Sequence, residues 1–314
     1  MTRDHLARRM MKDDEAKRGL NRVASFVFDH SSYYATRALG IIAPRVPMRL
    51  GYALIGWLAD TAYRRGNATM HGLHENIRHA MGVSVPADEV DRVARRAFRV
   101  LLQNYFDLFR LPALQAQQLR ALVSIDGWEN ITAARAMGRG LILLTAHVGN
   151  PEAGMQLISA TDLPVIGPAE HVQPERLYRY LVALRTRHGL RLIPSDGPLL
   201  ELFRALRRNE AVGLALDRDT TGSGVPVTLC GAPVRVPDGY AQLAAKLRLP
   251  LVPAFCYRLA NGQARLEVGK AFLPDTSASR DEVHRAALDF GTCELERAIT
   301  AHPDQWVLTT PLWI

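Results

Sequence analysis

The stretch Leu141-Ile-Leu-Leu-Thr-Ala-His-Val-Gly-Asn-Pro-Glu152 predicts a strand, a short loop and the start of a helix. Residues 142–144 form a continuous apolar run, which is typical of a strand that is covered on both faces. Asn150 is a favourable residue for the position before a helix, and Pro151 suits the first helical position. We therefore expect an α/β fold in which His147 lies on the loop that follows a buried strand.

His147 and Glu152 are the candidate catalytic residues of this loop. Glu152 would lie in the first turn of the helix, where the helix dipole favours a carboxylate. Because the helix begins at Asn150, Glu152 can fold back towards His147, and an imidazole oriented by a carboxylate is the minimum machinery of a general base. Gly149 permits a close approach of the backbone, and free N–H groups at the helix start could stabilise an oxyanion. The alternative is a structural histidine beside a helix cap.

The chain from about residue 121 onwards alternates between short apolar runs and amphipathic stretches. Strands are expected at 123–127, 141–146, 164–167, 190–193, 211–216, 251–257 and 264–268, with a hairpin at 225–236. Helices are expected at 128–137, from 151, and at 174–188, 198–209, 238–248 and 280–301. This alternation predicts an α/β fold with a mixed, largely parallel sheet that is flanked by helices. Sites in such sheets gather where strands end and helices begin.

The segment Asp217-Arg-Asp-Thr-Thr-Gly-Ser-Gly224 follows another predicted strand and supplies the second group of candidate site residues. Asp217, Arg218, Asp219, Gly222 and Gly224 could bind Mg²⁺, hold a phosphate through the arginine, or simply cap the strand. The glycine spacing matches neither the GxGxxG dinucleotide pattern nor the GxxxxGK[ST] phosphate-binding loop. The choice between binding and structure stays open here.

Arg185 and Arg187 lie at the end of the helix that is expected to stop at Gly189. Arginines there are commonly solvated and favoured by the helix dipole, and a phosphate contact is the alternative. GxSxG and HExxH motifs are absent from the sequence, so serine and zinc hydrolases have no support. The cysteines Cys230, Cys256 and Cys293 are odd in number and far apart, which argues against a disulfide framework or a CxxC metal site, and for a reducing compartment.

Residues 1–120 predict a helical, membrane-associating region, and residues 121–314 predict the α/β core. Apolar and aromatic residues of the first region alternate with arginines: Phe26, Phe28, Tyr33, Tyr34, Arg37, Leu39, Ile41, Ile42, Arg45, Arg49, Tyr52, Ile55, Trp57, Leu58, Tyr63, Arg64 and Arg65. The pattern suits an interfacial membrane helix, and a core helix with surface arginines is the alternative. We find neither a secretory signal nor an apolar run of the ~18 residues that a span needs.

The net charge of the 314 residues is +8, with a pI of about 9.7. Such a surface favours an acidic partner, which can be nucleic acid, anionic lipid or an acidic carrier protein.

The segment around His147 resembles the H-x4-D/E motif of glycerolipid acyltransferases, and its His-x-Gly-Asn form resembles that of the lipid A biosynthesis acyltransferase family. Further landmarks of that family are matched in order at 75–82, 98–111, 185–189, 217–225 and 302–306. The Asp-Arg-Asp-x-x-Gly-x-Gly-Val form is more similar to the mycobacterial phosphatidylinositol mannoside acyltransferases than to the lauroyltransferases of lipid A. Pro151 and Leu308 depart from the family, which usually has aromatic residues there.

The resemblance implies a glycerolipid acyltransferase-like fold and an O-acyltransferase reaction. An acyl chain would move from acyl-CoA or an acyl carrier protein to a hydroxyl of a membrane glycolipid or phospholipid, without an acyl-enzyme. His147 would be the base, Glu152 would fix its tautomer, and backbone N–H groups near Gly149 or a nearby arginine would hold the oxyanion. The expected substrate-binding residues are Gly149, Asn150, Arg185, Asp217, Arg218, Asp219, Gly222 and Gly224.

We further expect no metal, no cofactor besides the acyl donor, and no nucleic-acid partner. The expected location is the cytoplasmic face of the cell membrane, with peripheral or monotopic attachment and an apolar tunnel that opens at His147. Two alternatives remain: a lipid or thioester hydrolase that uses the same dyad, and a non-enzymatic basic protein that binds membranes or nucleic acid.

Overall fold

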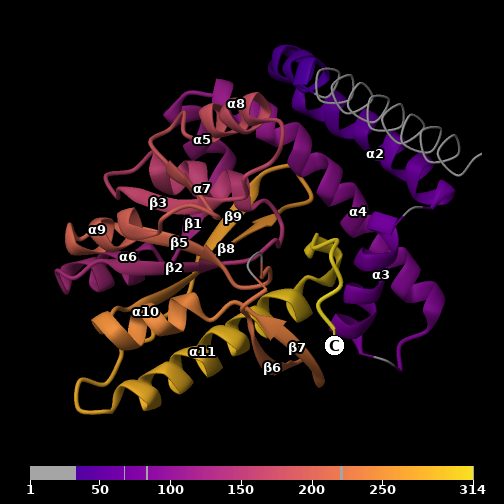
Figure 1. Ribbon diagram of the computed structural model, residues 1–314. Helices are drawn as coiled ribbons and strands as arrows, with labels where there is room; N and C mark the ends of the chain where they lie inside the picture. Colours follow the sequence, from indigo (N-terminus) through magenta and orange to yellow (C-terminus); the bar gives the residue numbers. More distant parts are fainter. Residues whose placement is uncertain (1–32, 67, 83, 220–221, 314) are drawn as a thin grey trace, which may run out of the picture.

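The computed structural model describes residues 33–66, 68–82, 84–219 and 222–313. The expectations for residues 1–32, including Phe26 and Phe28, lie outside the described residues. Figure 1 shows a sheet with helices on both faces, and an outer layer made by the N-terminal helices.

The N-terminal part of the described chain is helical, as predicted. Residues 33–42 are helical, and the elements that follow are η1 (Ala43–Arg45), α2 (Met48–Arg65), α3 (Ala68–Met81), α4 (Ala87–Arg110), η2 (Leu111–Ala113) and α5 (Ala116–Leu122). Helix α4 begins after Pro86, and its apolar stripe packs against α2 and α3 through a buried cluster that includes Val90, Ala97 and Phe98. Figure 1 shows α2 on the outer side of α4, away from the sheet.

The central sheet has seven strands in the order β1-β9-β8-β2-β5-β3-β4. Their bounds are β1 (Val123–Asp126), β2 (Leu141–Thr145), β3 (Val165–Ala169), β4 (Arg191–Pro194), β5 (Ala211–Ala215), β8 (Leu251–Arg258) and β9 (Ala264–Val268). All neighbouring pairs are parallel except β8 and β9, which are antiparallel. The predicted mixed, largely parallel sheet is therefore confirmed.

The remaining elements are α6 (Trp128–Ala136), α7 (Pro151–Ser159), α8 (Glu175–Arg185), α9 (Leu200–Arg207), α10 (Gly239–Leu247), α11 (Arg280–Ala301), η3 (Pro303–Gln305) and the hairpin of β6 (Val225–Leu229) and β7 (Ala232–Val236). The hairpin turns at Cys230 and Gly231, which both have positive φ angles, of 50° and 75°. A two-residue turn with this geometry matches the right-handed twist of the strands that it joins. The predicted hairpin is confirmed.

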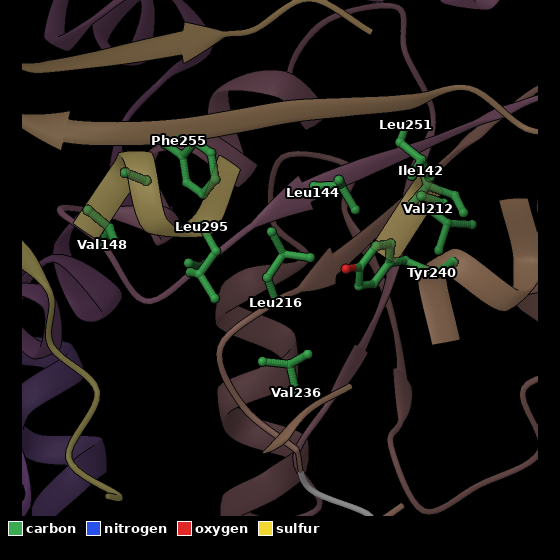
Figure 2. Close-up of a cluster of buried hydrophobic side chains, with 14 of the residues drawn as sticks. Ile142, Leu144, Val148, Val212, Leu216, Val236, Tyr240, Leu251, Phe255 and Leu295 are labelled. Carbon is green, nitrogen blue, oxygen red and sulfur yellow. The ribbon is translucent and has the colours of Figure 1, made fainter. Parts of the chain in front are cut away.

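Strand β2 is buried on both faces because its side chains alternate between two cores. Ile142 and Leu144 pack in a cluster with residues of α9, α10 and α11, and Figure 2 shows both of them near Val212 and Tyr240. Leu141 and Leu143 belong to a second cluster, with residues of α5, α6 and α7. The continuous apolar run therefore has the expected cause, and the loop that carries His147 leaves the sheet from its interior.

Large apolar side chains are exposed on the outer helices. They include Leu39, Ile41 and Ile42 in the segment before α2, Leu50, Leu54, Trp57 and Leu58 on α2, and Tyr105 on α4. Across the described ranges, every helix is too short or too polar to cross a membrane. The sheet begins at Val123, close to the expected change of rhythm, and the division into two domains stays a prediction.

Candidate active site

His147 and Asp217 lie side by side at the carboxyl edge of the sheet. Strands β2 and β5 are parallel, and Thr145 pairs with Ala215, so residues two positions further along each strand meet beyond its end. The Nδ1 atom of His147 lies 2.9 Å from Oδ1 of Asp217, and the backbone N–H of His147 donates to Oδ2 at 2.9 Å. The bond to Asp217 occupies Nδ1, so Nε2 is the ring nitrogen that remains for a substrate proton.

Asp217 is fully buried and is held as an anion by its donors. The indole N–H of Trp306 donates to Oδ2 at 3.0 Å, beside the N–H of His147. Burial alone would raise the pKa of Asp217, but the His147 charge and these hydrogen bonds outweigh it, so the pKa is lowered. A buried carboxylate that stays charged can orient the imidazole and stabilise its protonated form.

The environment of His147 suits a general base. Its side chain is 38% exposed, which leaves the ring accessible to a substrate. Desolvation lowers the pKa of His147, yet the Asp217 carboxylate beside it has the stronger effect, so the pKa is raised. Arg218 and Arg185 act in the opposite direction on this pKa, which puts two positive charges near the ring.

Glu152 does not have the position that the sequence suggested for it, because the carboxylate on Nδ1 of His147 is that of Asp217. Glu152 lies in the first turn of α7, as expected, and its Oε2 is 3.0 Å from Nε of Arg185. Its other oxygen accepts from Gln156 at 2.7 Å. This corrects the expectation that Glu152 fixes the tautomer, and it assigns Glu152 to holding Arg185 near the site.

The backbone of the loop after His147 is already hydrogen bonded. The N–H of Gly149 donates to the carbonyl of Gln305 at 2.8 Å, and the N–H of Asn150 donates to the carbonyl of Cys256 at 2.7 Å. The predicted use of N–H groups near Gly149 for an oxyanion is therefore not supported for these two. For the alternative that the sequence left open, a nearby arginine, Arg185 and Arg218 are the candidates, because their charges oppose the raised pKa of His147. That role stays a prediction.

Asn150 is 2% exposed and has a structural role, and its expected contact with substrate stays a prediction. Its side-chain oxygen accepts from the N–H of Ala153, which makes it the predicted cap of α7. Its amide nitrogen donates to Asp107 at 2.8 Å. Gly149 is likewise buried, and its φ of 64° brings the backbone so close to β8 that a Cβ would lie 2.2 Å from the carbonyl oxygen of Cys256.

Asp219 is hydrogen bonded to two glycines that follow it in the chain. Its carboxylate accepts from the N–H of Gly222 at 3.0 Å and from the N–H of Gly224 at 2.6 Å. Arg218 pairs with Glu170, which follows β3, at 2.8 Å. Within the described ranges, no group of three His, Cys, Asp or Glu side chains is arranged to hold a metal ion. Substrate contacts of Arg218, Asp219, Gly222 and Gly224 stay predictions.

A C-terminal segment, which no local sequence pattern connects to the site, completes it. The N–H of Val307 donates to the carbonyl of His147 at 2.8 Å, and Val148 forms a bridge with Trp306. In the sequence, this segment coincides with the family landmark at 302–306. These two contacts, which we call the C-terminal clamp, hold the backbone of the loop at His147 and Val148.

The expected apolar tunnel at His147 stays a prediction. A cavity of about 270 Å³ lies against α6 and is lined by Trp128, Ile131, Thr132, Arg135, Ala136 and Leu163. His147 is not part of that lining.

Comparisons with known proteins place the chain in a family. The chain matches the model of the bacterial lipid A biosynthesis acyltransferase family over residues 25–314. It is 31% identical to phosphatidylinositol mannoside acyltransferase from Mycobacterium tuberculosis over 251 residues. The aligned part covers 77% of this chain and 76% of that protein. The protein of that name from Mycolicibacterium smegmatis is 29% identical over 262 residues, with 82% and 83% covered.

Among solved structures, the 1-acyl-sn-glycerophosphate acyltransferase from Thermotoga maritima matches 64% of this chain and 86% of its own. The sequence identity is 16% and the TM-score is 0.35, so nothing further is inferred from this likeness.

Proposed function

Because the chain belongs to the bacterial lipid A biosynthesis acyltransferase family and is an acyltransferase, we propose that it acylates a hydroxyl of a membrane glycolipid or phospholipid. The acyl donor is a thioester, either acyl-CoA or acyl carrier protein. The observation that carries the proposal is the His147–Asp217 pair, in which Nδ1 is bonded to a buried carboxylate and Nε2 remains for the acceptor. The relatives named for phosphatidylinositol mannoside support a lipid-linked sugar as the acceptor.

The proposed chemistry is a direct transfer with one general base. Nε2 of His147 takes the proton of the acceptor hydroxyl while its oxygen attacks the thioester carbonyl carbon. The C–S bond then breaks, and the leaving thiolate takes the proton back from the imidazolium. Asp217 stabilises the imidazolium in between, and a positioned base of this kind contributes about 10²–10⁴-fold.

An arginine takes the role of the oxyanion donor in this proposal. Arg185 is held by Glu152 and Arg218 by Glu170, so both guanidinium groups are positioned by a carboxylate. The family motif residue Glu152 then contributes by orienting Arg185. One oxyanion donor is worth about 10²–10³-fold in rate.

We also propose that the protein works at the cytoplasmic face of the cell membrane and binds its surface peripherally. The exposed apolar residues of α2 and of residues 33–42 support this location, since arginines flank them and the net charge is +8. Both candidate donors are acidic, which also suits a basic protein.

The test is an acyl-transfer assay with the full chain, radiolabelled palmitoyl-CoA or palmitoyl acyl carrier protein, and vesicles that contain candidate acceptors. Mass spectrometry would identify the acylated lipid. The expected result is transfer that depends on the acceptor and is lost in His147→Ala. Full transfer by His147→Ala would overturn the mechanism, and thioester consumption without any acceptor would indicate a hydrolase instead.

A further inference from the structure

Asp107 of α4 and Arg258 at the end of β8 form a buried ion pair behind the catalytic loop. The Nη2 atom of Arg258 lies 2.6 Å from Oδ2 of Asp107, and the two side chains are 9% and 1% exposed. A buried pair gains little stability over apolar packing, whereas loss of one partner leaves an uncompensated charge. Stability alone therefore does not explain why an ion pair lies at this position.

The pair is bonded to the catalytic loop from two sides. Asp107 accepts from the side-chain amide of Asn150, three residues after His147, at 2.8 Å. Asn104 donates to the carbonyl of Gly149 at 2.7 Å, and its own oxygen accepts from Nε and Nη2 of Arg258 at 3.1 and 2.6 Å. A displacement of either charged side chain would therefore move the loop that carries the imidazole.

The same pair is bonded to α2 through a single hydroxyl. Tyr52 donates to Asp107 at 2.8 Å and accepts from Nη1 of Arg258 at 2.9 Å. Burial raises the pKa of Tyr52 to about 12, so the hydroxyl keeps its proton at neutral pH. Two residues away on the same helix, Leu50 and Leu54 are exposed. Tyr52 thus joins the inner side of an outward-facing helix to the pair.

We propose that Asp107 and Arg258 are positioning residues for acyl transfer, which set the catalytic loop through Asn150 and Asn104 and tie its position to α2 through Tyr52. The role in transfer rests on the proposed function of His147. The bonds supply orientation to the base, and a misplacement of about 1 Å at a reacting group costs about 10²-fold in rate.

Tyr52→Phe is the decisive variant, because the ring stays and only the hydroxyl is removed. Tyr63 is its matched control: it lies on the same helix and donates to Asp91 of α4 at 2.8 Å, away from the pair. We expect Tyr52→Phe to lower kcat by about 2–10-fold with an unchanged KM, and Tyr63→Phe to behave as wild type. Asp107→Asn should lower kcat further, by about 10²-fold.

Hydrogen exchange measured by mass spectrometry reports how often the loop opens, and it does not depend on acyl-transfer activity. In the full chain, Tyr52→Phe and Asp107→Asn should speed exchange in peptides that cover residues 146–153 and leave α11 protected, which a general loss of folding would not do. The proposal is overturned if Tyr52→Phe matches Tyr63→Phe in kcat and in loop exchange, or if kcat falls while loop exchange is unchanged. If His147→Ala keeps full transfer, the proposed function fails, and the exchange result still decides whether the pair holds the loop.

Discussion

Asp217→Asn tests the assignment of Asp217 as the residue that orients His147. Two donors, the N–H of His147 and the indole of Trp306, converge on Oδ2 of Asp217. An asparagine must therefore turn its oxygen towards them and its NH₂ group towards Nδ1 of His147. Nδ1 then becomes an acceptor, and the ring carries its proton on Nε2, where it cannot act as a base.

The expected loss follows from this change of tautomer. General-base catalysis contributes about 10²–10⁴-fold, so kcat should fall by that factor while KM is unchanged. This corresponds to a rise of about 3–5 kcal/mol in the activation free energy. The Asp217 carboxylate raises the pKa of His147, so its loss should move the acid limb of any residual activity to lower pH. The sign follows because a base works only when neutral and a lower pKa keeps it neutral further into acid.

The assay is a pH profile of kcat/KM for acyl transfer by wild type and Asp217→Asn, with circular dichroism at each pH as the control for folding. Transfer within about threefold of wild type would refute the orienting role, as would an acid limb that moves to higher pH. A raised KM with kcat retained would instead indicate the substrate-binding role that the sequence suggested for Asp217.

Two further predictions concern the loop and the outer helix. Gly149→Ala should abolish transfer and lower the melting temperature much more than Gly138→Ala does. Both glycines have positive φ angles, where strain alone costs about 1–3 kcal/mol, but only at Gly149 would a Cβ meet the backbone of β8. Equal melting temperatures of the two variants would contradict this. Leu54→Glu should weaken flotation with acidic phospholipid vesicles, whereas Leu273→Glu, at a similarly exposed position before α11, should not; equal binding by both variants would remove α2 from the membrane-binding surface.

The sequence was sufficient for the architecture around His147 because the relevant signals are local. The apolar run at 142–144, the cap at Asn150 and the turn at Cys230 and Gly231 each act within a few residues. Such signals place a strand, a helix start and a hairpin in the right positions. They also put His147 and Asp217 at the ends of strands, where a site was expected.

The partner of His147 could not be found in this way because it depends on which strands are neighbours. Glu152 is five residues away in the chain, yet the pairing of β2 with β5 brings Asp217, 70 residues away, to Nδ1. The N–H groups that were expected to be free at the loop are hydrogen bonded for a similar reason, because their acceptors, the carbonyls of Gln305 and Cys256, belong to distant segments. Contacts of this range are properties of the topology, and no local pattern encodes them.

The clamp by the C-terminal segment has a consequence for how the enzyme is made. Trp306 and Val307 leave the ribosome after all strands of the sheet, and chains fold from their N-terminal parts during synthesis. The sheet can therefore assemble while the carbonyl of His147 and the carboxylate of Asp217 still lack their last donors. Activity would then begin only when this segment docks, so a chain interrupted before Trp306 would fold around an unfinished site.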